Sequence, residues 1–155
     1  MQASRKKKTI EVPGLPEWLT VARAYQTCDK VMHRKLAEAG LTVPQYDLLM
    51  SLMKKDGQTQ QELAERLLVV KSNVSSLLSR AERDGFVERR ENPEDGRGKV
   101  VTLTGAGKRL ARRGWKVQAE VVTTMFESMT PRELEQVAQT MKRVRQALEP
   151  LLDAD

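Results

Sequence analysis

The sequence predicts a mainly α-helical fold with one small antiparallel β-hairpin, and three observations support this prediction. Apolar residues recur at helical spacing along most of the 155 residues. The period changes to two only in the segments 86–91 (FVERRE) and 99–104 (KVVTLT), which flank a charged loop that contains glycines. The content of 39% hydrophobic and 31% charged residues is typical of a helix-rich globular protein.

Four helices are expected before the hairpin, each with its own start or stop signal. The first follows the turn residues at 13–16 and ends at Gly40, a residue type that favours a left-handed C-terminal cap. The second (LTVPQYDLLMSLMKKDG) and the third (TQQELAERLLV) begin with the spacing of a capping box, a threonine followed three residues later by Gln or Glu. The fourth (VKSNVSSLLSRAERDG) should bury the face formed by Val74, Leu77, Leu78 and Ala81.

Two longer helices are expected after the hairpin. One spans about Gly105 to Met129 with Thr104 as its cap, and the other begins at TPRELEQ with Thr130 as its cap. The last helix carries an apolar seam with no obvious partner in so small a fold, so a symmetric second subunit is expected to cover it. The seam consists of Leu134, Val137, Ala138, Met141, Val144, Leu148 and Leu151.

Several classes of protein are excluded by what the sequence lacks. There is no run of about 18 apolar residues and no signal-peptide pattern, so a cytoplasmic protein is expected. A single cysteine, Cys28, excludes an internal disulfide and a cysteine-rich zinc site, and a single histidine, His33, excludes His-pair metal motifs. We therefore expect no metal, no cofactor and no enzymatic activity. Cys28 lies on an apolar stripe, and a buried, inert thiol is favoured over a redox sensor.

The charge of the chain is compatible with a polyanionic partner without establishing one. The net charge is +6, from 27 basic and 21 acidic residues. The segment 44–104 nevertheless holds ten basic and ten acidic residues. A nucleic-acid partner must therefore be argued from where the charges lie and not from their sum.

The order helix, short helix, helix, hairpin is that of a winged helix-turn-helix. In this arrangement the short helix and the turn hold the next helix so that its outer face can enter a DNA major groove. The face of the fourth helix opposite Val74 and Ala81 carries Ser72, Ser76, Ser79 and Arg83, and Asn73 and Arg80 flank it. Serine can pair with several bases, whereas asparagine and arginine carry more sequence information. A solvated serine-rich face is the alternative interpretation of the helix alone.

The hairpin loop carries a second candidate for DNA contact. Arg97 stands between Gly96 and Gly98, and glycines allow close approach to a DNA backbone. A narrow minor groove attracts such a cation. A solvated turn is the alternative interpretation of the loop alone. The candidate DNA-binding residues of helix and loop together are Lys71, Ser72, Asn73, Ser75, Ser76, Ser79, Arg80, Asp95, Arg97 and Lys99.

The segment from Thr59 to Leu110 resembles the DNA-binding core of the MarR family of winged-helix transcription regulators. Its most specific match is the wing pattern D-x-R-x-x-x-V-x-L-T, formed by Asp95, Arg97, Val101, Leu103 and Thr104. The resemblance implies a homodimer that binds double-stranded DNA at a palindromic promoter site, most often as a repressor. It also implies that recognition helix 71–84 and wing 91–99 contact the DNA, with the wing arginine in the minor groove and the aspartate orienting it.

The resemblance also implies a division of the chain. A winged helix-turn-helix DNA-binding lobe is expected at 41–104 and a helical dimerisation lobe at 13–40 and 105–155. Residues 1–12 are polar and basic, so their composition predicts a basic disordered tail. In this family a small-molecule pocket usually opens between the two lobes, so a small aromatic or anionic effector is a further expectation. Its candidate residues, for which packing roles are the alternative, are Trp18, Tyr25, Tyr46 and Asp47. The rival function is a winged-helix protein-assembly module without sequence-specific DNA binding, which predicts an acidic or apolar outer face on the fourth helix.

Overall fold

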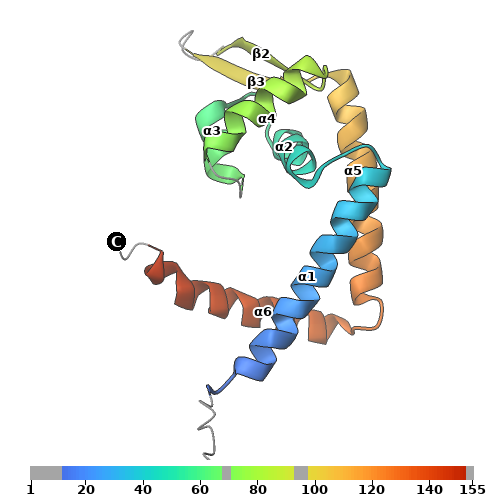
Figure 1. Cartoon of the computed structure of the whole chain (residues 1–155), viewed down its shortest axis with the longest axis vertical. Coiled ribbons are helices and arrows are strands. Elements are labelled where there is room, and N and C mark those ends of the chain that lie inside the picture. Colours follow the sequence, from blue (N-terminus) through green and yellow to red (C-terminus); the bar gives the residue numbers. More distant parts are fainter. Residues whose placement is uncertain (1–11, 68–70, 93–97, 153–155) are drawn as a thin grey trace, which may run out of the picture. The chain divides into compact units, whose positions relative to one another are not determined.

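The computed structural model describes residues 12–67, 71–92 and 98–152 (Figure 1). The predicted fold class, mainly α with a small antiparallel sheet, is confirmed. The elements in chain order are α1 (Leu15–Glu38), α2 (Val43–Lys54), β1 (Gln58–Thr59), α3 (Gln60–Arg66), α4 (Lys71–Arg83), β2 (Val87–Glu91), β3 (Lys99–Leu103), α5 (Gly105–Phe126), α6 (Pro131–Leu148) and a 3-10 turn, η1 (Glu149–Leu151). The basic tail predicted at 1–12 lies almost wholly outside the described residues.

The predicted capping signals operate as expected. A capping box begins three helices, with Thr42, Thr59 and Thr130 as the caps. Each threonine hydroxyl accepts a hydrogen bond from the backbone N–H three residues later, and the Gln or Glu side chain at that position accepts one from the backbone N–H of the threonine. Gly40 has a φ of 81°, and the N–H of Leu41 donates to the carbonyl of Leu36, which is the hydrogen bond that closes a Schellman motif. The helix starts and stops are therefore set locally by the sequence.

The sheet corrects one prediction, because the described residues form three strands and not a two-stranded hairpin. The strand order is β1-β3-β2, with both pairs antiparallel. Gln58 pairs with Val101, and Thr59 pairs with Val100. A strand of two residues shows no alternation of apolar and polar positions, and Thr59 is also the N-cap of α3, so the sequence pattern conceals it.

One helix end also differs from the prediction. α5 ends at Phe126 and not near Met129, and the N–H of Met129 instead donates to the carbonyl of Phe126 in a turn. α6 ends at Leu148, and Pro150 lies in the 3-10 turn that follows. Proline lacks a backbone N–H and cannot donate an α-helical hydrogen bond, which accounts for the change of helix type.

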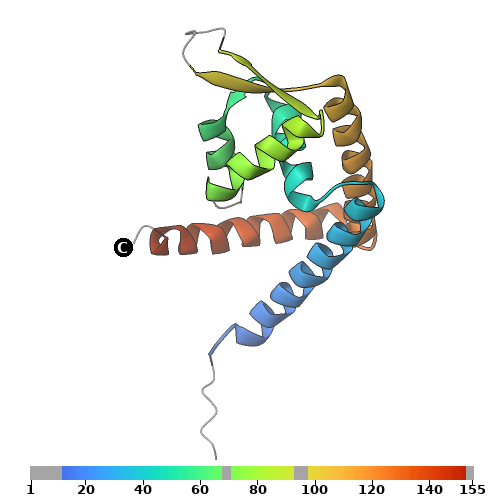
Figure 2. The same cartoon turned by 45° about the horizontal axis from the view of Figure 1, so that its top comes forward.

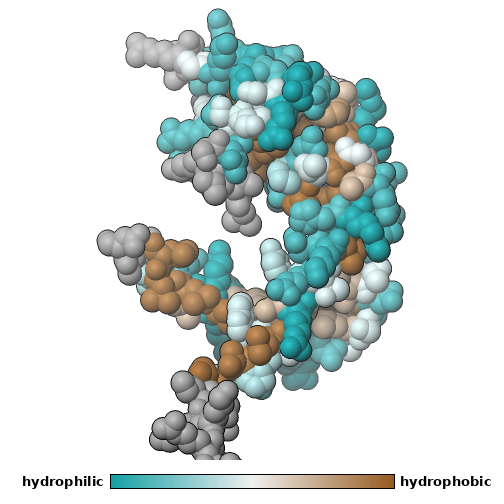
Figure 3. All heavy atoms as spheres, in the orientation of Figure 1, coloured by the Kyte–Doolittle hydropathy of each residue, from teal (hydrophilic) through white to brown (hydrophobic). Residues whose placement is uncertain are grey.

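The chain divides into two compact units at 117 and 118, within α5. The first unit holds a single hydrophobic core to which α1 to α5 and the sheet contribute. Its largest fully buried apolar side chains are Leu36, Leu48, Leu49, Leu52, Leu63, Val74, Leu78 and Val101. Within this unit the hairpin of β2 and β3 extends past α3 and α4 (Figure 2). The second unit consists of the rest of α5, α6 and η1, and apolar side chains lie exposed along α6 (Figure 3).

Candidate nucleic-acid interface

The two faces of α4 differ as the sequence predicts. Val74, Leu77, Leu78 and Ala81 are all buried in the core. The described side chains of the other face are exposed, and each can donate or accept a hydrogen bond; they are Asn73, Ser75, Ser76, Ser79, Arg80 and Arg83. Burial of one face fixes the helix, so the polar face is presented to solvent in one orientation.

The C-terminal end of α4 is locked to the start of α5. Gly85 has a φ of 76°, which favours glycine, and the N–H of Phe86 donates to the carbonyl of Ala81. The hydroxyl of Thr104 donates to the carbonyl oxygen of Gly85 over 2.7 Å and accepts from the N–H of Gly107 over 3.0 Å. The cap predicted at Thr104 therefore also joins the end of α4 to the end of β3.

Asp56 joins the turn after α2 to the wing. Its Oδ1 accepts from the backbone N–H of Leu103 over 3.0 Å and from that of Gly57 over 3.2 Å. The Nζ of Lys108 lies 4.0 Å from its Oδ2. The sequence gives no local signal for this role, because Asp56 and Leu103 are 47 residues apart.

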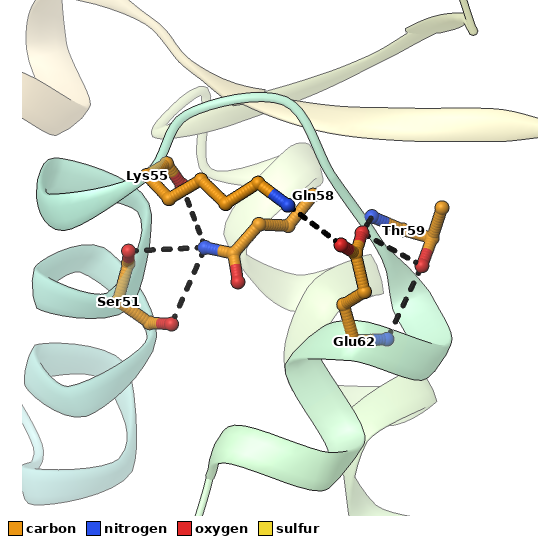
Figure 4. A network of polar contacts seen from close by, with 5 residues as sticks. All are labelled: Ser51, Lys55, Gln58, Thr59 and Glu62. Carbon is orange, nitrogen blue, oxygen red and sulfur yellow. Dashed lines mark hydrogen bonds and ion pairs between the residues drawn. The ribbon is translucent and has the colours of Figure 1, made fainter.

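A polar network holds the end of α2 against the start of α3 (Figure 4). The buried side chain of Gln58 donates from Nε2 to the carbonyls of Lys55 (2.6 Å) and Ser51 (3.0 Å). The Nζ of Lys55 contacts Oε1 of Glu62 at 2.7 Å, and Thr59 donates to the same carboxylate. These hydrogen bonds, first that of Lys55 and then those of Thr59, lower the pKa of Glu62 to about 2. The carboxylate is therefore ionised while it caps α3.

Carboxylates neutralise most cations near the C-terminal end of α4. Arg83 contacts Asp84 at 3.2 Å, and ion pairs also join Arg89 to Glu82 and Arg90 to Glu88. Arg80 differs, because its guanidinium donates to the carbonyl and the hydroxyl of Ser76. Both of these partners are neutral, and no carboxylate among the described residues forms an ion pair with Arg80.

The wing is described only up to the edges of its loop. Lys99 is exposed at the start of β3, and Gly98 has a φ of 84°. The N–H of Asn92 donates to the carbonyl of Gly98 over 3.2 Å, which closes the base of the loop. Asp95 and Arg97 lie outside the described residues, as do the side chains of Lys71 and Ser72, so their DNA contacts stay predictions.

The four predicted pocket residues have different environments. Trp18 and Tyr25 are 55% and 71% exposed on α1, whereas Tyr46 is buried. Burial, and then the neighbouring charge of Asp47, raise the pKa of Tyr46 to about 12. Burial also raises the pKa of Asp47. Whether these residues bind a ligand stays a prediction.

A cavity of about 340 Å³ lies between α2 and α5 and was not predicted from the sequence. Among its lining residues, only the aromatic side chain at 115 could have indicated the cavity from the sequence. The lining residues, none of which is among the predicted pocket residues, are Met50, Met53, Lys54, Ala111, Arg112 and Trp115.

The short helix α3, the recognition helix α4 with its exposed polar face, and the sheet that follows define a DNA-binding protein of the winged helix-turn-helix class. None of the helices in the described ranges combines the length and the apolar composition that a membrane crossing needs.

Comparison with known proteins gives the family. A protein-family model, that of the MarR family, matches residues 39–98. An uncharacterized HTH-type transcriptional regulator of Bacillus subtilis, YfiV, is 30% identical over 109 residues, which are 70% of this chain and 68% of YfiV. The HTH-type transcriptional repressor IacR of Pseudomonas putida is 26% identical over 134 residues, which are 86% of this chain and 79% of IacR. Among solved structures, a mutant MarR from E. coli complexed with operator DNA has a TM-score of 0.73 and 25% identity, covering 84% of this chain and 94% of that one.

The chain belongs to the MarR family. It is a DNA-binding transcription regulator and not an enzyme.

Proposed function

We propose that the protein is a dimeric repressor that binds a palindromic operator through α4 and the wing of each subunit. The observation that carries the proposal is the outer face of α4, on which the described side chains are neutral hydrogen-bonding groups and two arginines. One of them, Arg80, forms no ion pair with a described carboxylate. Such groups can pair with base edges in a major groove. The likeness to IacR, a repressor, and to MarR complexed with operator DNA supports this role.

The apolar seam of α6 supports a dimer. Apart from Ala138, its residues recur at alternating spacings of three and four, which is the 3.5-residue period of a helix that packs against another helix. The seam is exposed within this chain; Leu148, for example, is 51% exposed. A second copy would bury it, and two-fold symmetry would then place two recognition helices on one face of a palindrome with half-sites about one helical turn apart.

The cavity between α2 and α5 supports a small aromatic or anionic effector. Trp115 and two methionines supply apolar and aromatic surface. Lys54 and Arg112 also line the cavity, and neither forms an ion pair with a described residue. An aromatic carboxylate would match both features, since its ring would contact the apolar surface and its charge would face the cations. A ligand bound there would release DNA if it favours a different spacing of the two recognition helices.

The rival function, a protein-assembly module, is not favoured. It requires an acidic or apolar outer face on α4, whereas the described side chains there are serines, an asparagine and two arginines. A module of this kind would also show no preference among DNA sequences.

Selection of bound sites from random double-stranded DNA tests the proposal. We expect an inverted repeat with half-sites centred about 10 base pairs apart. Sedimentation equilibrium at micromolar concentration should give twice the chain mass. Recovery of unrelated sequences only, or a monomer that binds with full affinity, would contradict the proposal. Effector binding is tested separately by quenching of Trp115 fluorescence with benzoate in the Trp18→Phe variant, in which Trp115 is the remaining tryptophan.

A further inference from the structure

Arg80 is the distinctive cation of the recognition helix. The other described arginines at its C-terminal end and on β2 face carboxylates, namely those of Asp84, Glu82 and Glu88. A cation held against a carboxylate must exchange that partner before it can bind DNA. Arg80 has only neutral partners among the described residues, so its charge attracts DNA without such an exchange.

The hydrogen bonds between Arg80 and the neutral Ser76 also hold the guanidinium in a defined orientation. Ser76 and Arg80 lie one helical turn apart, and both are exposed on the face opposite Val74 and Ala81. Nε of Arg80 donates to the carbonyl oxygen of Ser76 over 3.3 Å, and Nη2 donates to Oγ over 3.2 Å. These two bonds use the side edge of the guanidinium. The outer edge, formed by Nη1 and the second N–H of Nη2, forms no hydrogen bond with a described residue.

The free outer edge matches one base. Two parallel N–H donors pair with O6 and N7 of guanine in the major groove, which is the commonest specific contact of arginine with DNA. The bonds to Ser76 restrict the long side chain before DNA arrives, so less conformational freedom is lost on binding. The hydroxyl of Ser76 therefore favours the arginine geometry that can read guanine.

We propose that Arg80 reads one guanine in each half-site and that Ser76 is a positioning residue that acts through Arg80. This inference rests on the proposed function, in which α4 enters the major groove. It changes the role of Ser76 from a side chain that contacts a base directly to one that orients its neighbour. The two residues then form a single specificity element.

The test measures affinity for the selected operator and for operators in which each base pair is replaced in turn. Arg80→Ala should lose the preference for guanine at one position per half-site by roughly 10-fold or more, as expected for a bidentate contact. Arg80→Lys keeps the charge but should lose the same preference. Ser76→Ala should lose part of it at the same position, and Ser76→Thr, which keeps the hydroxyl, should retain it.

The coupling between the two residues decides the outcome. In the Arg80→Ala background, Ser76→Ala should cause no further loss, because it acts through the missing side chain. Ser79→Ala is the matched comparison, since no hydrogen bond among the described residues joins Ser79 to Arg80; its effect should add to that of Arg80→Ala. Circular dichroism confirms that each exposed-residue variant folds.

Three results would overturn the inference. If Ser76→Ala changes preference at a different position from Arg80→Ala, or if their effects add, Ser76 reads DNA on its own. If Arg80→Ala weakens binding uniformly on all sequences, Arg80 contacts a phosphate. A wild-type protein that selects no sequence at all would overturn the proposed function, and this inference with it. In the first two cases specific binding by the wild type would leave the proposed function standing.

Discussion

Gly107 in the first turn of α5 lies against the turn between α4 and β2, and its replacement by alanine should destabilise the protein. A Cβ at this position would lie 2.0 Å from the carbonyl oxygen of Phe86 and 3.1 Å from Cδ2 of Leu103. The carbonyl of Phe86 is backbone and accepts a hydrogen bond from the N–H of Thr104 over 3.1 Å, so it cannot move away without breaking that bond.

The expected loss of stability follows from two destabilising effects and one stabilising effect. Forcing a methyl group into a packed site costs about 1–3 kcal/mol. Loss of the Thr104 hydrogen bond adds about 0.5–1.5 kcal/mol. The better helix propensity of alanine offsets up to about 1 kcal/mol. We expect a net loss of about 2 kcal/mol, which for a chain of this length lowers Tm by about 4–8 °C.

Thermal unfolding followed by circular dichroism at a fixed protein concentration measures the effect, because the Tm of a dimer depends on concentration. Gly105→Ala is the matched control. A Cβ there would lie 3.6 Å from the flexible side chain of Arg109, an ordinary van der Waals contact, so its Tm should equal or slightly exceed that of the wild type. If Gly107→Ala is as stable as Gly105→Ala, α5 does not approach Phe86 as closely as described.

Three further predictions concern pH, assembly and the wing. The pKa of Glu62 is lowered from 4.5 to about 2, so the stabilisation by its carboxylate is complete above pH 4.5 and is lost as the pH falls toward 2. The Tm difference between the wild type and Glu62→Gln should therefore shrink as the pH falls through this range. A Tm difference that stays constant would contradict this prediction. Val144→Glu places a charge in the apolar seam and should give a monomer in sedimentation equilibrium. Gln146→Glu, on the opposite face of α6, should leave the dimer intact. Dimers from both variants would rule out the seam as the interface. In a double-mutant cycle on operator DNA, Arg97→Ala and Asp95→Ala should each weaken binding. The two losses of affinity should not add, since the aspartate is expected to act through the arginine. Tighter binding by Asp95→Ala would mean that the aspartate only repels phosphate.

The sequence predicts the helices and their caps because the signals are local. Thr59 and Glu62 need only each other to form a capping box, and the buried face of α4 follows from the spacing of its apolar residues. The exposed polar face of α4 is predicted for the same reason. The resemblance of the wing pattern adds the expected roles of Asp95 and Arg97, which lie outside the described residues.

Contacts between distant residues could not be predicted in this way. Asp56 accepts from the N–H of a residue 47 positions later, and no periodicity records such a contact. Gly107 looks in sequence like any glycine near a helix start, yet the space around it is closed by Phe86. The cavity between α2 and α5 depends on side chains that meet only after both helices have packed on the core.

The short strand β1 has a consequence for solubility. β3 holds Val100, Val101 and Leu103, a β-branched and apolar segment that could pair with other chains if one of its edges were open. β1 covers part of one edge and β2 covers the other. The outer strand β2 carries four consecutive charged residues, Glu88 to Glu91, which oppose strand-to-strand association between molecules. A strand of only two residues thus helps to shield β3 from pairing with the strands of other molecules.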